Sequence, residues 1–248
     1  MRLVKLAPAA AVALSGAALL VLALAPLGTA LGWWHFRFGL YSMIPASGYA
    51  AAAAAVLAAV TLALGWSHVR SRGRLVLAIA LVMGAILAYV PWHYQRIRST
   101  LPPIHDIATD TDNPPAFVAV LPARGAENAG SAVYDHAELP QLQKKAYPDL
   151  APITAAVPVA KAFDQALEVA RAMPGWTIVA FDAKAGRIEA SQQSRWFRFT
   201  DDVVIRIAGN EAASRIDMRS TSRQGRSDYG VNAARIRAYM TALRQRLG

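Results

Sequence analysis

The sequence contains no cysteine among its 248 residues. Disulfide bonds, catalysis by a thiolate, haem attachment through a C-x-x-C-H motif and lipidation of an N-terminal cysteine are therefore excluded. The absence has a practical side as well, because any cysteine introduced into the chain is a unique chemical label.

Acidic residues are absent from the first 105 positions, and Asp106 is the first of sixteen. The first 98 residues hold eight Lys and Arg, so most of the formal net charge of +10 lies there. In the remainder, eighteen Lys and Arg face sixteen acidic residues, a net charge of +2. A nucleic-acid-binding domain carries a basic stripe on its folded part, so nucleic acid is not an expected partner.

Charge of either sign is missing from three long stretches, residues 6–34, 38–67 and 75–95. Each exceeds the roughly 20 apolar residues that a helix needs to cross about 30 Å of hydrocarbon. Tryptophan favours the membrane interface, and four of the six tryptophans mark ends of these stretches: Trp33, Trp34, Trp66 and Trp92. The pattern predicts a membrane region over residues 1–98, with three transmembrane helices near residues 8–31, 44–66 and 75–94 and the lipid bilayer as a partner.

The second apolar stretch is rich in alanine, at positions 50–55, 58 and 59. Small side chains let helix backbones approach closely. We expect this face to be used in packing the three helices of one chain. An interface between two copies is the alternative, and the sequence leaves the oligomeric state open.

Lys and Arg are enriched in the cytoplasmic segments of membrane proteins. Five precede the first helix or fill the second loop (Arg2, Lys5, Arg70, Arg72 and Arg74), whereas three lie in the other flanking segments (Arg37, Arg96 and Arg98). This bias predicts a multi-pass protein of the bacterial inner (plasma) membrane, with its C-terminal domain on the periplasmic or extracytoplasmic side. The alternative for the first helix is a cleaved signal peptide ending at residues 28–30, although its apolar run is longer than such peptides usually carry.

Nine of the fourteen prolines fall within residues 99–158. Because proline blocks helix interiors and lacks an N–H donor, this segment is expected to be an extended connector, with room for one strand at residues 117–121. His105, Asp106 and Asp110 are potential metal ligands within it, but a second histidine at usable spacing is missing. We therefore expect these side chains to form turns and caps, and we predict no metal site.

Residues 159–173 show the i, i+3, i+4, i+7 spacing of an amphipathic helix, which Pro174 and Gly175 end. Four strand-like runs follow at residues 176–181, 187–192, 198–208 and 214–222, and then a last helix at residues 231–247. Short connections favour antiparallel pairing. The prediction for residues 159–248 is an α+β domain: a four-stranded antiparallel sheet with two helices packed on one face.

Side-chain alternation sets the register of the last two strands. Aligning their apolar faces places Ile205 opposite Met218 on the inner face, and Arg206 opposite Asp217 on a face expected to be exposed. The same register places Asp201 opposite Ser222. Asp202 then lies opposite Thr221 and diagonal to Arg219 and Arg223.

The segment F-T-D-D-V at residues 199–203, followed by R-S-T-S-R-Q-G-R-S-D-Y-G-V-N-A-A-R-I at residues 219–236, resembles the family known as domain of unknown function 1499. Residues 102–117 also resemble the segment that leads into the domain in membrane-anchored members. Family members often have a cysteine in that segment, and this chain has none. The resemblance covers roughly residues 100–248, supports the domain boundary and implies no activity.

The arginine-rich motif, residues 219–235, suggests a site for an anion at the beginning of the last helix, where guanidinium groups and free N–H groups converge. An anionic lipid headgroup or a cell-wall component is the expected ligand of such a binding module in a membrane-tethered domain. The candidate binding residues are Arg219, Ser220, Ser222, Arg223, Arg226, Ser227, Asp228, Asn232 and Arg235.

Two alternatives remain. In the first, the motif is purely structural in a scaffold or interaction protein, with ion pairs through Asp201, Asp202, Arg206 and Asp217. In the second, which has less support, the serines and aspartates belong to a hydrolase, but the motif contains no histidine to act as a base. We predict no catalytic residue and no cofactor.

Individual roles within the motif can also be predicted. Arg219 and Arg223 should form ion pairs with Asp202. Gly225 and Gly230 should allow a compact turn at positive φ, and Asp228 or Asn232 should cap the last helix. The two remaining arginines, Arg226 and Arg235, have no acidic partner visible in the sequence.

The predicted topology is testable with single cysteines at Ser71 and Ala183. If the C-terminal domain lies outside the cytoplasm, an impermeant maleimide applied to cells with a permeabilised outer layer should label position 183 and spare position 71. Labelling after lysis provides the control for reactivity at both positions. The reverse pattern in intact cells would contradict the orientation.

Overall fold

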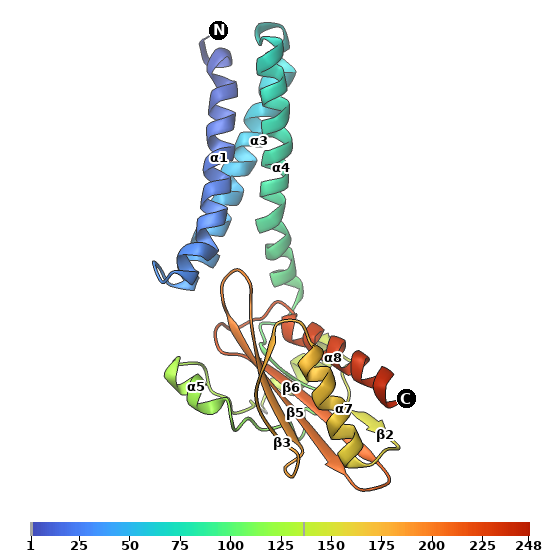
Figure 1. Cartoon of the computed structure of the whole chain (residues 1–248). Helices are drawn as coiled ribbons and strands as arrows, with labels where there is room; N and C mark the ends of the chain where they lie inside the picture. Colours follow the sequence, from blue (N-terminus) through green and yellow to red (C-terminus); the bar gives the residue numbers. More distant parts are fainter. Residues whose placement is uncertain (1, 136) are drawn as a thin grey trace. The chain divides into compact units, whose positions relative to one another are not determined.

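The computed structural model describes residues 2–135 and 137–248. The chain forms two compact units that divide between Ser99 and Thr100 (Figure 1). The first unit is helical and the second is α+β, in agreement with the fold class expected from the sequence.

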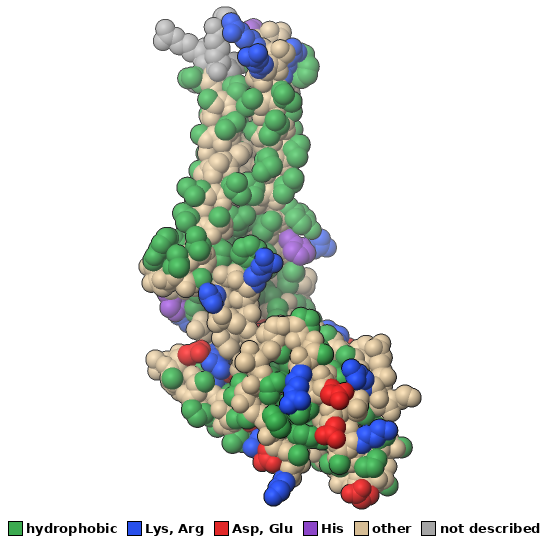
Figure 2. Space-filling model, viewed as in Figure 1, with side chains coloured by type: hydrophobic (Ala, Val, Ile, Leu, Met, Phe, Trp, Pro, Cys, Tyr) green, Lys and Arg blue, Asp and Glu red, His purple; other side chains and the backbone are tan. Residues whose placement is uncertain are grey.

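The helical unit contains three helices that are long and apolar enough to cross a membrane, within Leu6–Ala30, Phe36–Leu64 and Ser71–Thr100. Figure 2 shows hydrophobic side chains exposed along the length of this unit. The three helices correspond to the three uncharged stretches of the sequence. The first begins six residues before its predicted start, the second ends two residues before its predicted end, and the third extends beyond both predicted ends. The elements are α1 (Arg2–Ala30), α2 (Phe36–Phe38), the π-helical turn η1 (Gly39–Met43), α3 (Ile44–Leu64), the 3₁₀ turn η2 (Trp66–His68) and α4 (Ser71–Thr100).

The alanine-rich face of α3 is used inside the chain. Ala51, Ala54 and Ala58 are all buried. A Cβ atom added to Gly84 of α4 would lie 2.7 Å from the carbonyl oxygen of Ala51, so the two backbones approach closely there, as small residues permit. This agrees with the expected packing of the helices within one chain.

Four antiparallel strands form a meander in the second unit: β3 (Trp176–Asp182), β4 (Arg187–Gln193), β5 (Thr200–Gly209) and β6 (Ser214–Ser222). The predicted register of β5 and β6 is confirmed. Asp201 lies opposite Ser222, Asp202 opposite Thr221 and Arg206 opposite Asp217.

The sheet has six strands, so the predicted count of four was wrong. Two three-residue strands, β1 (Asp106–Ala108) and β2 (Ile153–Ala155), both pair with β6 along its outer edge. β1 pairs with residues 219–221 and β2 with residues 214–216. Such short strands lack a period-2 pattern, and the partner of β1 lies more than a hundred residues away, so local sequence carries no signal for them.

Residues 99–158 differ from the extended connector that the prolines suggested. Residues 117–121 form no strand, and the segment contributes the helices α5 (Leu121–Ala126) and α6 (Leu139–Ala146). Ile104 and Ile107 are buried in the same core as the two long helices of the unit. The segment is therefore part of the α+β unit.

The helices α7 (Val159–Ala172) and α8 (Val231–Leu247) cover one face of the sheet, as predicted (Figure 1). The core between them and the sheet includes Phe163, Ile205 and Ile236. The Tyr239 ring stacks on Trp176 at 5.5 Å, and its hydroxyl donates to the carbonyl of Ala166 at 2.9 Å. These contacts join α8 to both α7 and β3.

The opposite face of the sheet is largely covered over β4, β5 and β6, contrary to the expectation for the Arg206–Asp217 pair. The segment of residues 109–135, which includes α5, covers it, and Val204 packs there against Phe117 and Val120. Arg206 donates to Asp217 at 2.9 Å, but the Asp217 side chain is only 1% exposed. The predicted pairing of Arg206 with Asp217 was therefore right, and the prediction that the pair is exposed to solvent was wrong.

Gly186, in the β3–β4 turn, adopts φ +59°, and an added Cβ would lie 2.0 Å from the carbonyl oxygen of Ile207. We expect Gly186→Ala to destabilise the domain by roughly 1–3 kcal/mol, because both the left-handed backbone and the contact penalise a side chain. Gly125→Ala is the matched control, since nothing lies within 4 Å of its added Cβ. Denaturant unfolding of the full chain in detergent measures both, and equal effects would contradict the assignment.

Candidate functional site

The arginine-rich motif begins on β6 and ends in the second turn of α8. Gly225 and Gly230 in the connecting turn have φ +90° and +83°, as predicted. The Asp228 carboxylate accepts hydrogen bonds from the backbone N–H of Gly230 at 2.9 Å and of Asn232 at 2.7 Å. Asp228 therefore caps α8, and the negative charge suits the positive end of the helix dipole.

Asn232 is fully buried at the start of α8 and uses its whole side chain. Its amide oxygen accepts from the Ser220 hydroxyl at 2.6 Å and from Arg235. Its amide nitrogen donates to the Ser222 hydroxyl at 3.0 Å and to the carbonyl of His105 at 2.9 Å. A single side chain thus joins α8 to β6 and to the residue that leads into β1.

Arg235 lies on the same inner face, one turn further along α8. Its guanidinium donates to Asp201 at 2.6 Å, to Gln192 at 2.6 Å and to the Ser220 hydroxyl at 2.9 Å. Arg235 thus has an acidic partner, Asp201, that was not visible in the sequence. The strand register places Asp201 opposite Ser222. Because the Asp201 side chain points toward the helices, it also reaches Arg235 of α8. A strand register does not reveal this contact between strand and helix.

Asp202 points to the opposite face and is fully buried. Its carboxylate accepts two hydrogen bonds from Arg223, at 2.9 and 2.8 Å, and one from Arg124 at 2.8 Å. The Ser191 hydroxyl adds a fourth at 2.6 Å. Arg223 also pairs with Glu127 at 2.5 Å, so this cluster ties α5 and the following turn to the outer face of the sheet.

Arg219 was expected to pair with Asp202 and instead pairs with Asp106 of β1. Its guanidinium makes two hydrogen bonds to that carboxylate, at 2.8 and 2.7 Å. The rings of Phe117 and Tyr134 lie 5.0 and 5.3 Å from the guanidinium carbon, as in cation–π contacts. The ion pair supplements the short β1–β6 ladder and holds the segment of residues 109–135 in place.

Glu189, fully buried on the outer face of β4, was missed by the sequence reasoning. It accepts hydrogen bonds at 3.0 Å from the backbone N–H groups of Val118, Ala119 and Val120, just before α5. Its strand reads R-I-E-A-S-Q-Q, so one more polar residue among several carried no signal for a buried role. Arg124 was missed too, and its signal was a lone charge in a neutral stretch.

Arg226 and Ser227 occupy the exposed part of the turn. Arg226 is exposed, and within residues 2–135 and 137–248 it has no ion pair. Ser227 accepts a hydrogen bond from the backbone N–H of Tyr229 at 3.3 Å. Of the motif's four arginines, three are therefore buried and paired, and Arg226 alone remains available to solvent.

The two aspartates of these clusters have opposite pKa shifts. Burial raises the pKa of Asp202, but the hydrogen bonds from Arg223, Ser191 and Arg124 outweigh it, and the net pKa lies below the ordinary value of 3.8. Burial raises the pKa of Asp228 above that value, and the nearby charge of Asp201 adds to the effect despite the backbone hydrogen bonds to the carboxylate. The cap is therefore easier to protonate than the ion-paired cluster.

Both aspartates among the potential metal ligands near β1 have other partners. Asp106 binds Arg219, whereas Asp110 accepts from the backbone N–H groups of Asp112 and Asn113 at 3.1 and 2.9 Å and from Arg215 at 2.8 Å. Across the described part of the chain, no group of three or more His, Asp and Glu is placed to hold a metal ion.

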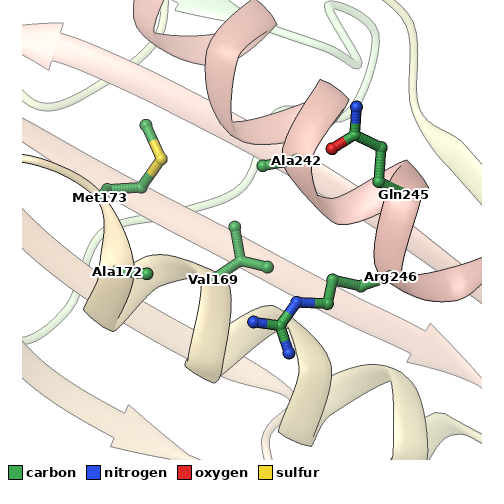
Figure 3. A pocket seen from close by; sticks show the side chains of 6 residues that line it. All are labelled: Val169, Ala172, Met173, Ala242, Gln245 and Arg246. Carbon is green, nitrogen blue, oxygen red and sulfur yellow. The ribbon is translucent and has the colours of Figure 1, made fainter.

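A surface pocket of about 310 Å³ lies between the C-terminal halves of α7 and α8 (Figure 3). Figure 3 shows Val169 and Ala172 on α7 and Ala242 and Gln245 on α8, with the Arg246 side chain extending from α8 toward Val169. The pocket lies about 15 Å along α8 from Asn232, at 1.5 Å per residue. It therefore shares no residue with the arginine-rich motif.

The comparison with known families decides what the chain is related to. A family described as "Protein of unknown function (DUF1499)" matches residues 106–243, which is more than half of the chain. The chain belongs to this family. The match begins at β1, so the DUF1499 region includes the proline-rich segment that covers the sheet. Searches of curated proteins and of solved structures returned no match.

The buried cluster around Asp202 generates a stability prediction. Asp202→Asn leaves the guanidinium groups of Arg124 and Arg223 without their buried carboxylate, so we expect a loss of about 3–5 kcal/mol in the free energy of unfolding. Asp149→Asn is the matched control, because the Asp149–Arg237 pair is 51% and 42% exposed and should contribute at most ~1 kcal/mol. Equal effects in denaturant titrations would contradict the structural role.

Acid stability should depend on the same carboxylate. Because the pKa of Asp202 is lower in the folded state, its contribution is present at neutral pH and is lost as pH falls from about 4 through the folded pKa. We expect Asp202→Asn to flatten the fall in melting temperature below pH 4. The fall should not vanish, because Asp110 and Asp149 also have lowered pKa values. An unchanged slope in the variant would refute this role.

Proposed function

We propose that this DUF1499 protein is a multi-pass membrane protein of the bacterial plasma membrane that presents a rigid, non-catalytic α+β interaction module outside the cytoplasm. In this proposal the buried part of the arginine-rich motif is the scaffold of the module. The observation that supports it most strongly is that the buried arginines of the motif already have partners. Arg219, Arg223 and Arg235 are each buried, and each binds a carboxylate of the same domain.

The serine hydroxyls support the same conclusion. A catalytic serine needs a base within hydrogen-bond reach that can take its proton. The Ser220 hydroxyl donates to the Asn232 amide oxygen and accepts from Arg235, and the Ser222 hydroxyl accepts from the Asn232 amide nitrogen. An amide and a guanidinium do not serve as a base at neutral pH, and these contacts suit a structural role.

This assignment is tested with a fluorophosphonate probe, which labels activated serines. We expect no labelling of the full-length protein in detergent, with a known serine hydrolase as the positive control. Labelling that disappears in Ser220→Ala, Ser222→Ala or Ser227→Ala, at an unchanged melting temperature, would replace the scaffold by a hydrolase.

A second candidate function is anion binding at Arg226, the exposed and unpaired arginine of the motif within the described residues. It preserves part of the predicted anion site, for an anionic lipid headgroup or a cell-wall component. The positive end of α8 is occupied by Asp228, so the contact would rest on the guanidinium alone and should be weak and sensitive to salt.

The test is a thermal shift of the full chain with short-chain phosphatidylglycerol or an anionic wall fragment, against short-chain phosphatidylcholine. We expect a stabilising shift with the anionic ligands, lost in Arg226→Gln at an unchanged melting temperature without ligand. Asp202→Asn should lower that melting temperature instead. The absence of any shift in the unmodified protein would end the anion-binding candidate and leave the scaffold assignment in place.

A further inference from the structure

The loop between β4 and β5, residues 194–199, combines exposed cations with exposed aromatic surface. Its sequence is S-R-W-F-R-F, with no acidic residue. Trp196 is 68% exposed, more than any other large aromatic side chain described in the α+β unit. The guanidinium carbon of Arg195 lies 5.5 Å from the Trp196 ring centre. A single exposed apolar side chain is common in water, but an exposed tryptophan beside exposed arginines is the combination that an anionic membrane interface favours.

The loop is held in one shape by its own hydrogen bonds. The backbone N–H of Ser194 donates to the carbonyl of Phe199 at 2.7 Å, and the N–H of Phe199 donates to the Ser194 hydroxyl at 2.8 Å. Arg198 adopts φ +56° and donates to the Gln193 side chain at 3.2 Å. The Phe197 and Phe199 rings stack at 5.4 Å. Binding through this loop would therefore cost little ordering entropy.

The topology of the sheet places this loop at a particular end. β4 ends and β5 begins at the end of the sheet where β6 ends, since Arg223 donates its N–H to the carbonyl of Thr200. The chain enters at that same end, because the carbonyl of His105 accepts from the N–H of Ser222. Leu101 follows α4 directly, so only residues 101–105, at most about 18 Å of extended chain, separate α4 from this end of the sheet.

We propose that the β4–β5 loop is a second membrane contact, which inserts Trp196 into the interfacial layer of an anionic phospholipid bilayer while Arg195 and Arg198 bind lipid phosphates. Tryptophan favours that layer because its ring is apolar and its N–H is polar. Arginine binds phosphate with paired hydrogen bonds. The short tether holds the loop within reach of the bilayer, so binding is intramolecular at high effective concentration. The inference rests on the membrane-anchoring part of the proposed function and not on Arg226.

The opposite end of the sheet provides the matched control. The β3–β4 turn lies there and contains Ala183, which is exposed and flanked by Asp182 and Lys184. Neither an aromatic residue nor an arginine occupies residues 182–186. A probe at Ala183 therefore reports a surface of the same domain where the charges of Asp182 and Lys184 balance and where the tryptophan and arginines of the β4–β5 loop are missing.

The experiment uses the full chain in vesicles, with a nitroxide on a single cysteine in place of Arg195 or of Ala183. In the variant labelled at position 195, Trp196 and Arg198 carry the proposed contact. In vesicles of phosphatidylcholine with phosphatidylglycerol, collisions with a water-soluble nickel chelate should be several-fold fewer at position 195 than at position 183. The protection should decrease in phosphatidylcholine alone and in high salt. Trp196→Ser combined with Arg198→Gln should abolish it, with an unchanged signal from position 183 as the control for folding.

Two results would overturn the inference. One is equal access of the nickel chelate to both positions in the anionic vesicles. The other is protection at position 195 that is the same in both lipid compositions and in the double variant, since this would indicate contact with protein. Symmetric vesicles have the same lipids in both leaflets, so with the nickel chelate present on both sides of the bilayer the result does not depend on the predicted orientation. It is also independent of serine labelling and of any thermal shift at Arg226.

Discussion

A buried guanidinium must be paired, and this constraint organises the α+β unit. Removing an arginine from water costs several kcal/mol unless a carboxylate and further hydrogen bonds replace the lost hydration. Arg219, Arg223 and Arg235 are all buried, and each has a carboxylate partner from another element. The partners come from β1 and β5, so the pairs can form only when the sheet has its native order.

Neighbouring residues of one strand serve opposite faces of the sheet. Asp201 points inward to Arg235 of α8, and Asp202 points outward to Arg124 of α5. Because side chains alternate along a strand, this dipeptide links both covering layers to β5. The two layers are therefore coupled through β5.

The parts of this arrangement that follow from local rules were predictable from the sequence. The β5–β6 register, the positive φ of Gly225 and Gly230 and the cap at Asp228 follow from alternation, glycine chemistry and helix capping. What could not be predicted depends on contacts between distant residues. The partner of Arg219 is Asp106, which lies 113 positions away.

The outer face shows the same limit. A sheet that carries Asp202, Arg206 and Asp217 on one face resembles a half-solvated antiparallel sheet. The proline-rich segment of residues 109–135 covers this face with few regular elements of its own. Arg124 of this segment binds Asp202, and Glu189 of β4 accepts from backbone N–H groups of the segment. Neither residue shows a periodic pattern that would reveal its role.

The pairing of β1 with β6 also has a consequence for the order of folding. β1 emerges during synthesis long before residues 219–221, so its edge and the carboxylate of Asp106 stay without native partners until nearly the whole chain exists. Loops of this length close slowly because their closure entropy is lost before any contact compensates. Closure of the last ladder, and not formation of the β3–β6 meander, should therefore limit the rate at which the unit reaches its native state.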